Sequence, residues 1–137
     1  MRTVHVFVFD PHGRLLLQQL GRGRDRHPLL WGSSVAGFPR PGEEEADAAS
    51  RRMSEELGLS DPVELVGTTV MRDGDSEKFV TLFEARAAHA DILEPDHIER
   101  IEFRGGEEIG REMVEHPANF TETFRHVFAF WLRQRRC

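Results

Sequence analysis

The apolar positions in the first part of the chain predict two paired strands followed by a loop. Residues 4–9 are apolar on both alternating faces, which is typical of a central strand. The next four residues, Asp-Pro-His-Gly at 10–13, suit a type I turn, so residues 14–20 are predicted to pair back as a second strand. Residues 21–28 predict an exposed basic loop, after which residues 30–35 lead toward the centre of the chain.

A helical repeat of apolar residues follows. Ala46, Ala49, Met53 and Leu57 fall on one stripe when residues 44–57 are drawn as a helix, so we expect that stripe to be buried. Gly58 comes directly afterwards, and glycine commonly ends a helix in this position.

The second half of the chain predicts further strands and then two helices. Strands are expected at residues 63–71 and 77–86, joined by a hairpin, and at residues 98–103. A helix over residues 107–115 should stop at His116-Pro117. Core packing by a last helix is predicted from five residues at helical spacing: Phe120, Phe124, Phe128, Trp131 and Leu132. The order of elements predicts an α+β fold, with a mixed β-sheet sandwiched between α-helices in a single domain over residues 1–137.

Composition narrows the classes of partner and compartment. The net charge of −6 argues against binding a nucleic-acid polymer, which would need a basic face. An acidic chain better suits a metal ion that bridges carboxylates to an anionic ligand. The N-terminal apolar run is too short for a signal peptide or a membrane span. The only cysteine is Cys137, so no intrachain disulfide can form, and a cytoplasmic protein is predicted.

The most informative pattern lies in residues 37–59. Their spacing is G-x5-E-x7-R-R-M-S-E-E-L-G-L, and its fixed positions are Gly37, Glu43, Arg51, Glu55, Glu56 and Gly58. This segment resembles the Nudix box, G-x5-E-x7-R-E-U-x-E-E-x-G-U with U apolar, and so implies the Nudix fold. The resemblance is broken at one position, where Arg52 replaces a glutamate.

The resemblance implies a role for most box residues. Glu55 and Glu56 would bind Mg²⁺ or Mn²⁺, and the main-chain carbonyl of Ala36 commonly joins them in this family. Glu43 and Arg51 match a structural pair that ties the loop to the helix, with Gly37 and Gly58 as further structural positions. The implied activity is metal-dependent hydrolysis of a diphosphate bond, in a nucleoside diphosphate linked to another group. Homodimers are common in the family, and the oligomeric state stays open.

Helix geometry shows why Arg52 matters. It lies three residues before Glu55 and four before Glu56, so it falls angularly between them, and all three are expected to face away from the stripe of Met53 and Leu57. A guanidinium can neither bind a metal nor accept a proton. It could instead compete with the metal for both carboxylates, or contact a substrate phosphate through its planar donors. Arg40, within the box loop, is a second candidate for substrate binding.

A second resemblance accounts for the arginine. Residues 31–43 are similar to the corresponding segment of isopentenyl-diphosphate isomerases, which carry Arg-Arg at the same box position and keep the second glutamate. Ala36 and Phe38 stand where those enzymes have a cysteine and a histidine that their reaction needs. The resemblance therefore implies that the diphosphate-binding half of the site is kept. Three functions follow in order of preference: hydrolysis, diphosphate binding with little or no turnover, and isomerisation.

Overall fold

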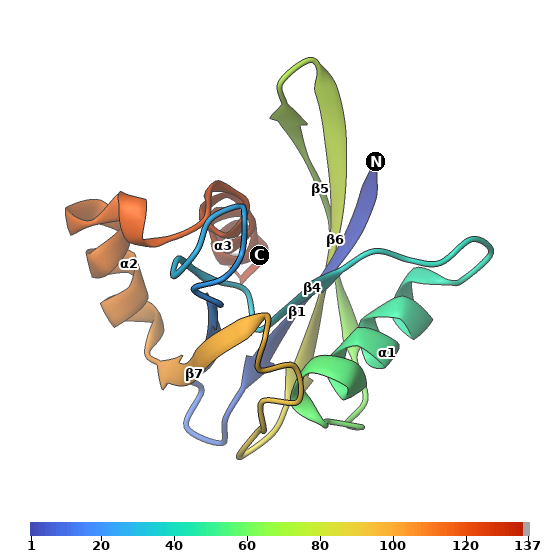
Figure 1. Ribbon diagram of the computed structural model, residues 1–137, viewed down its shortest axis with the longest axis horizontal. Helices are drawn as coiled ribbons and strands as arrows, with labels where there is room; N and C mark the ends of the chain where they lie inside the picture. The colour runs from blue at the N-terminus through green and yellow to red at the C-terminus, as the bar shows by residue number, and fades with distance from the viewer. Residues whose placement is uncertain (136–137) are drawn as a thin grey trace.

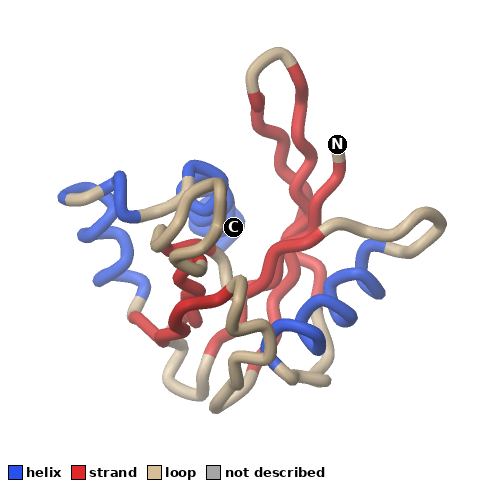
Figure 2. The backbone as a smooth tube through the Cα atoms, in the orientation of Figure 1, coloured by secondary structure: helices blue, strands red, loops and turns tan. Residues whose placement is uncertain are grey.

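The computed structural model describes residues 1–135 as a mixed sheet with three α-helices (Figure 1; Figure 2). Cys137, the only cysteine in the sequence, lies outside these residues. The fold class predicted from the sequence is confirmed. In chain order the elements are β1 (Arg2–Phe9), β2 (Leu15–Leu20), β3 (Trp31–Gly32), β4 (Val35–Gly37), α1 (Glu45–Leu57), β5 (Glu64–Asp73), β6 (Ser76–Arg86), β7 (Ile98–Arg104), α2 (Gly106–Glu115), a 3-10 turn (Pro117–Asn119) and α3 (Glu122–Arg135).

The central strand β1 is fully paired on one edge and shared between two strands on the other. Along one edge it runs parallel to β6 over its whole length, and β6 forms an antiparallel hairpin with β5. On the other edge β4 pairs antiparallel with residues 4–6 of β1, whereas β2 meets β1 only at Phe9 and Leu15. Beyond that point β2 pairs with β3 and β7 instead. The sheet therefore opens between β2 and β4.

The alternation of side chains along β1 separates two apolar cores. Val4, Val6 and Val8 face α1 and pack with its buried residues, among them Met53 and Leu57. Phe7 and Phe9 face the opposite way, into a core formed with α3 and its buried residues Phe124, Phe128 and Trp131. The prediction of a strand buried on both faces is thus confirmed.

Three residues assigned to buried stripes do not belong to them. Ala46 is exposed in the first turn of α1, and Ala48 is buried in its place. Phe120 is buried but precedes α3, in a β-bridge with Trp31. Leu132 is exposed by 40%, because α3 turns this position away from the core.

Glycines with positive φ lie at the first hairpin and at the end of α1, where the sequence predicts a turn and a helix end. Gly13 has φ +79° and donates a 2.9 Å hydrogen bond to the carbonyl of Asp10, which closes the first hairpin. Gly58 ends α1 with φ +70°, a left-handed conformation that favours glycine. Within residues 1–135, no helix is both long and apolar enough to span a membrane.

Candidate functional site

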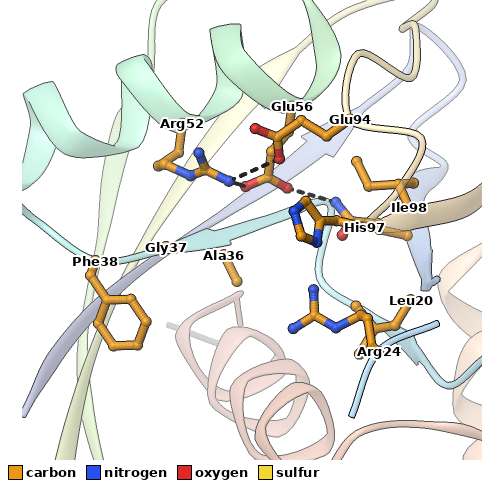
Figure 3. A pocket seen from close by; sticks show the side chains of 11 residues that line it. Leu20, Arg24, Ala36, Gly37, Phe38, Arg52, Glu56, Glu94, His97 and Ile98 are labelled. Carbon is orange, nitrogen blue, oxygen red and sulfur yellow. Dashed lines mark hydrogen bonds and ion pairs between the residues drawn. The ribbon is translucent and has the colours of Figure 1, made fainter. Parts of the chain in front are cut away.

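A cavity of about 440 Å³ lies where the sheet opens between β2 and β4 (Figure 3). The C-terminal half of α1 forms one wall, and the segment before β7 faces it across the opening. Its lining residues include Gln18, Arg24, Ala36, Gly37, Arg52, Glu56, Glu94 and His97. The volume is within the range of small-molecule sites. Two of the box residues predicted to carry chemistry, Arg52 and Glu56, therefore face this cavity.

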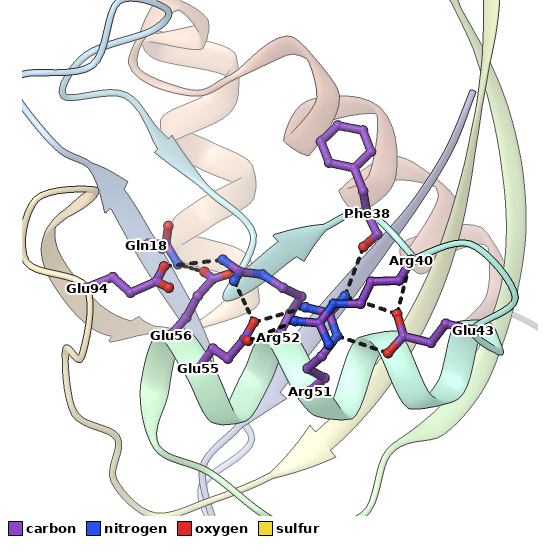
Figure 4. Close-up of polar contacts among 9 residues, drawn as sticks. All are labelled: Gln18, Phe38, Arg40, Glu43, Arg51, Arg52, Glu55, Glu56 and Glu94. Carbon is purple, nitrogen blue, oxygen red and sulfur yellow. Dashed lines mark hydrogen bonds and ion pairs between the residues drawn. The ribbon is translucent and has the colours of Figure 1, made fainter.

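Arg52 is the centre of a network of carboxylates (Figure 4). Its Nη1 donates to Glu55 Oε1 at 2.7 Å, and its Nη2 donates to Glu56 Oε2 at 2.8 Å. The same Nη2 donates to Glu94 Oε1 at 3.2 Å. Burial opposes the charge, but the attraction of Glu56 and hydrogen bonds to the other carboxylates raise the pKa of Arg52. The guanidinium of Arg52 is therefore a cation that three carboxylates hold in place.

Gly37 makes room for this arginine. A Cβ at this position would lie 2.6 Å from Cγ of Arg52, closer than side chains approach one another. The glycine of the box is thus required for the path of the Arg52 side chain across β4.

Glu56 is buried, with 4% of its surface exposed, and it lines the cavity. The chain after α1 folds back over the end of the helix, where Leu93 N–H donates to the Glu56 carbonyl at 3.0 Å. Gln18 Nε2 on β2 donates to Glu56 Oε1 at 2.8 Å. Burial raises the pKa of Glu56 to about 7, although hydrogen bonds from Gln18 and Arg52 work in the opposite direction.

Glu55 lies on the exposed side of the same turn, with 37% of its side chain accessible. Its Oε1 accepts hydrogen bonds from Arg52 at 2.7 Å and from Arg51 at 3.0 Å, and Arg40 lies 3.8 Å from Oε2. The hydrogen bond from Arg52 is the main reason that the pKa of Glu55 is lowered. The two neighbouring box carboxylates therefore have opposite pKa shifts. Arg40 contacts Glu55 and is not among the residues that line the cavity.

Glu43 and Arg51 form the ion pair that the box resemblance implies for the scaffold. Arg51 Nε donates to Glu43 Oε2 at 2.9 Å, and its Nη2 donates to Glu43 Oε1 at 3.0 Å. That Nη2 also donates to the carbonyl of Phe38, at 3.1 Å, and the Arg40 N–H donates to Glu43 Oε1 at 2.8 Å. These bonds join the loop before α1 to the middle of the helix. Hydrogen bonds from Arg51 and from the Arg40 backbone lower the pKa of Glu43 to about 2.

This ion pair predicts a dependence of stability on acid. The pKa of Glu43 falls from 4.5 to about 2 on folding. The ionised carboxylate therefore contributes to the free energy of unfolding above pH 4.5, and this contribution is lost as the pH falls toward about 2. We expect Glu43→Gln to unfold at lower urea concentration than wild type near neutral pH. The difference should narrow as urea titrations are repeated toward about pH 2. A constant difference across that range would contradict this role for the carboxylate.

The oxygen ligands at the site suit Mg²⁺ or Mn²⁺ in kind, since hard cations prefer carboxylates. In this arrangement, however, Arg52 binds an oxygen of each candidate carboxylate. Over residues 1–135 no group of three or more acidic, histidine or cysteine side chains is placed to hold a metal ion. Three arginines also face four carboxylates in the network, so most of the negative charge is already neutralised: Arg40, Arg51 and Arg52 against Glu43, Glu55, Glu56 and Glu94. A metal ion would therefore compete with Arg52 for these carboxylates.

Sequence reasoning missed two residues of this network, Glu94 and Gln18. Glu94 lies in the loop before β7, and it contacts Arg52 from 42 positions away in the chain. Gln18 holds Glu56 from 38 positions away, and its Nε2 also donates to the Ser34 carbonyl at 2.9 Å. No motif marks either residue, because their contacts depend on how β2 and the segment before β7 pack against α1.

Comparison with known proteins indicates the family that the box resembles. A sequence profile of the NUDIX domain matches residues 1–129. The isopentenyl-diphosphate Delta-isomerase of Pectobacterium atrosepticum is 30% identical over 136 residues, covering 93% of this chain and 74% of that protein. The isopentenyl-diphosphate Delta-isomerase 2 of Aromatoleum aromaticum is 47% identical over 58 residues, covering 42% of this chain but 31% of the relative. The match thus spans about a third of the length of that relative.

Solved structures resemble the whole fold. The MutT protein from Methanosarcina mazei Go1 has a TM-score of 0.81 at 15% identity, covering 100% of this chain and 96% of that one. The NUDIX domain of Shewanella oneidensis NrtR, complexed with ADP ribose, has a TM-score of 0.72 at 18% identity, covering 100% of this chain and 88% of that one. Together with the profile match, the box residues and the mixed sheet, these similarities show that the chain belongs to the NUDIX domain family.

Proposed function

We propose that this protein is a metal-dependent hydrolase of a small-molecule diphosphate, in which a nucleoside diphosphate is linked to another group. The observation that supports this most directly is the placement of Arg52 and Glu56 together on the cavity wall. One supplies a cation that suits phosphate, and the other a buried carboxylate. The complex of the NrtR domain with ADP ribose shows that a protein of this fold can hold a ligand of that class.

Two arginines would bind the diphosphate. Arg52 comes from α1, and Arg24, which lies in the loop after β2, points into the same cavity (Figure 3). A phosphate offers paired oxygens, as a carboxylate does, so the planar guanidinium of Arg52 can exchange a carboxylate partner for the ligand. That exchange would release Glu56 and Glu94 from the ion pairs that now engage them.

Glu56, released in this way, would hold the divalent ion together with Glu55, and the ion would offset phosphate charge and lower the pKa of a bound water molecule. The box glutamate that many relatives use as a ligand or base is absent, because Arg52 takes its place. The loss of a general base typically lowers a rate by about 10²–10⁴-fold. We therefore propose slow turnover and a metal affinity that rises when a diphosphate ligand is present.

A second candidate function is diphosphate binding without turnover. The specific observation in its favour is that Arg52 is hydrogen-bonded to all three nearby carboxylates, which leaves a metal ion without a ready ligand set. Isomerisation of isopentenyl diphosphate is favoured by the names of the relatives but not by the residues of the site. Ala36 and Phe38 line the cavity where that reaction would need a thiol and an imidazole, and neither side chain can transfer a proton.

Phosphate or nucleotide release from a panel of diphosphate-linked nucleotides tests the proposal. We expect slow, saturable cleavage with Mg²⁺ or Mn²⁺ and none with a chelator. Calorimetric binding of the same compounds separates the two candidates: binding without cleavage would favour the binding protein. If no compound binds or is cleaved, both candidates are wrong.

A further inference from the structure

A second cavity of about 520 Å³ continues from the first one. The two share Gln18, Leu20, Arg24, Ala36, Gly37 and Phe38, so they form one continuous space beside β4. The second part extends along β1 to the β5–β6 hairpin and to the start of α3, where Arg72, Lys78 and Thr123 line it. A ligand whose diphosphate lies at Arg52 would therefore place its linked group in this second part.

Positive side chains dominate this far part of the cavity. Arg26, Arg72 and Lys78 line it together with the shared Arg24, and Glu122 is the single acidic residue in its described lining. The chain as a whole carries a net charge of −6, so this local excess of cations runs against its average composition. Arg24, Arg26 and Arg72 form no ion pair with any side chain that the structure describes.

The loop that carries Arg24 and Arg26 is held against the sheet in a costly conformation. His27 and Leu29 have φ of +58° and +64°, a region that side chains other than glycine rarely adopt. Leu29 N–H donates to the Leu20 carbonyl at 3.0 Å, which fixes the end of the loop to β2. Strained backbone of this kind is concentrated at ligand sites.

Hydrogen bonds also hold side chains in place on the hairpin side of the second cavity. Lys78 Nζ donates to Thr123 Oγ1 at 3.0 Å, which links β6 to the first turn of α3. On the floor, His5 Nδ1 and Ser33 Oγ form a 2.7 Å hydrogen bond. Burial, together with the charge of Lys78, lowers the pKa of His5 to about 3, so its imidazole is neutral and adds no competing charge. The positive charge of this region therefore comes from the arginines and Lys78.

We propose that the second cavity binds a further phosphate group of the substrate, remote from the diphosphate bond. This inference rests on the proposed function and specifies its substrate class: a nucleoside diphosphate whose linked or ribose moiety carries an additional phosphate monoester. Arg26, from the loop after β2, and Arg72, from β5, are the principal ligands. Guanidinium groups suit this role because they bind phosphate oxygens in pairs.

Two pairs of natural compounds differ by one such phosphate and provide the test. NADPH and NADH differ by a 2′-phosphate, and coenzyme A and dephospho-coenzyme A differ by a 3′-phosphate. We expect the phosphorylated member of at least one pair to bind about tenfold or more tightly, as measured by calorimetry with and without Mg²⁺. In Arg26→Gln and Arg72→Gln the ratio of the dissociation constants of the two members should fall toward one.

The matched control is Arg111→Gln, which removes the same charge from an exposed position on α2 that does not line either cavity. It should keep the wild-type preference. Equal affinity for both members of both pairs, or a preference that survives loss of both Arg26 and Arg72, would overturn the inference while leaving the proposed function intact. Failure to bind any of the four compounds, when other diphosphates bind, would overturn the inference as well. Failure to bind any diphosphate would instead contradict the proposed function.

Discussion

We expect the Arg52→Glu variant to bind Mn²⁺ at the box helix in the absence of substrate, whereas the wild-type protein binds it weakly. The substitution removes the guanidinium that now engages Glu55, Glu56 and Glu94 and adds a fourth carboxylate to the cluster. Carboxylates that lose their cation repel one another, and a divalent ion relieves that repulsion. If the substituted glutamate also accepts a proton from water, turnover should rise by about 10²–10⁴-fold.

Electron paramagnetic resonance of Mn²⁺ measures the first effect without requiring turnover. Arg52→Gln is the matched control, because it removes the guanidinium but supplies no new charge, and we expect an intermediate Mn²⁺ affinity for it. Unfolding in urea should be followed with and without Mn²⁺, since the metal must stabilise Arg52→Glu more than wild type if it binds the folded site. Equal Mn²⁺ binding by wild type and Arg52→Glu would show that Arg52 does not compete for the carboxylates.

Local patterns predicted the fold well because its main elements bury continuous apolar faces. The run at residues 4–9 indicated the central strand, and Met53 and Leu57 indicated the buried side of α1. The errors lie at the ends of elements. Ala46 occupies the first turn of α1 and Leu132 the last turns of α3, and both are exposed although their neighbours Ala48 and Trp131 are buried. Periodicity indicates the face of a helix but not which positions at its edges and ends are covered.

The site was predictable only where its contacts are local. Arg52 lies within one helical turn of Glu55 and Glu56, so their pairing follows from spacing alone. The burial of Glu56 does not, because it depends on Gln18 of β2 and on the segment that folds over the end of α1. Glu94 enters the network by the same long-range packing.

The second large effect is expected from Glu56→Gln, which should lower turnover by about 10²–10⁴-fold. Glu56 is the buried box carboxylate that lines the cavity, whereas Glu55 lies on the exposed side of the helix with three arginines around it. Glutamine keeps the size of the side chain but removes the negative charge that a metal or a proton needs. Glu55→Gln is therefore the comparison variant, and its loss of turnover should be smaller. The reverse order would assign the essential charge to Glu55.

The same variant tests whether Glu56 is buried as described. The pKa of Glu56 rises from 4.5 to about 7 on folding, so the native state holds the proton more tightly than the unfolded chain does. The contribution of Glu56 to stability is therefore fully present below pH 4.5 and declines as the pH rises through about 7. Urea titrations at about pH 5 and about pH 8 should show wild type losing stability relative to Glu56→Gln at the higher pH. If the two proteins respond alike to pH while turnover still falls, Glu56 is catalytically important but accessible to water, and the closed arrangement of Gln18, Arg52 and Glu94 around it is wrong.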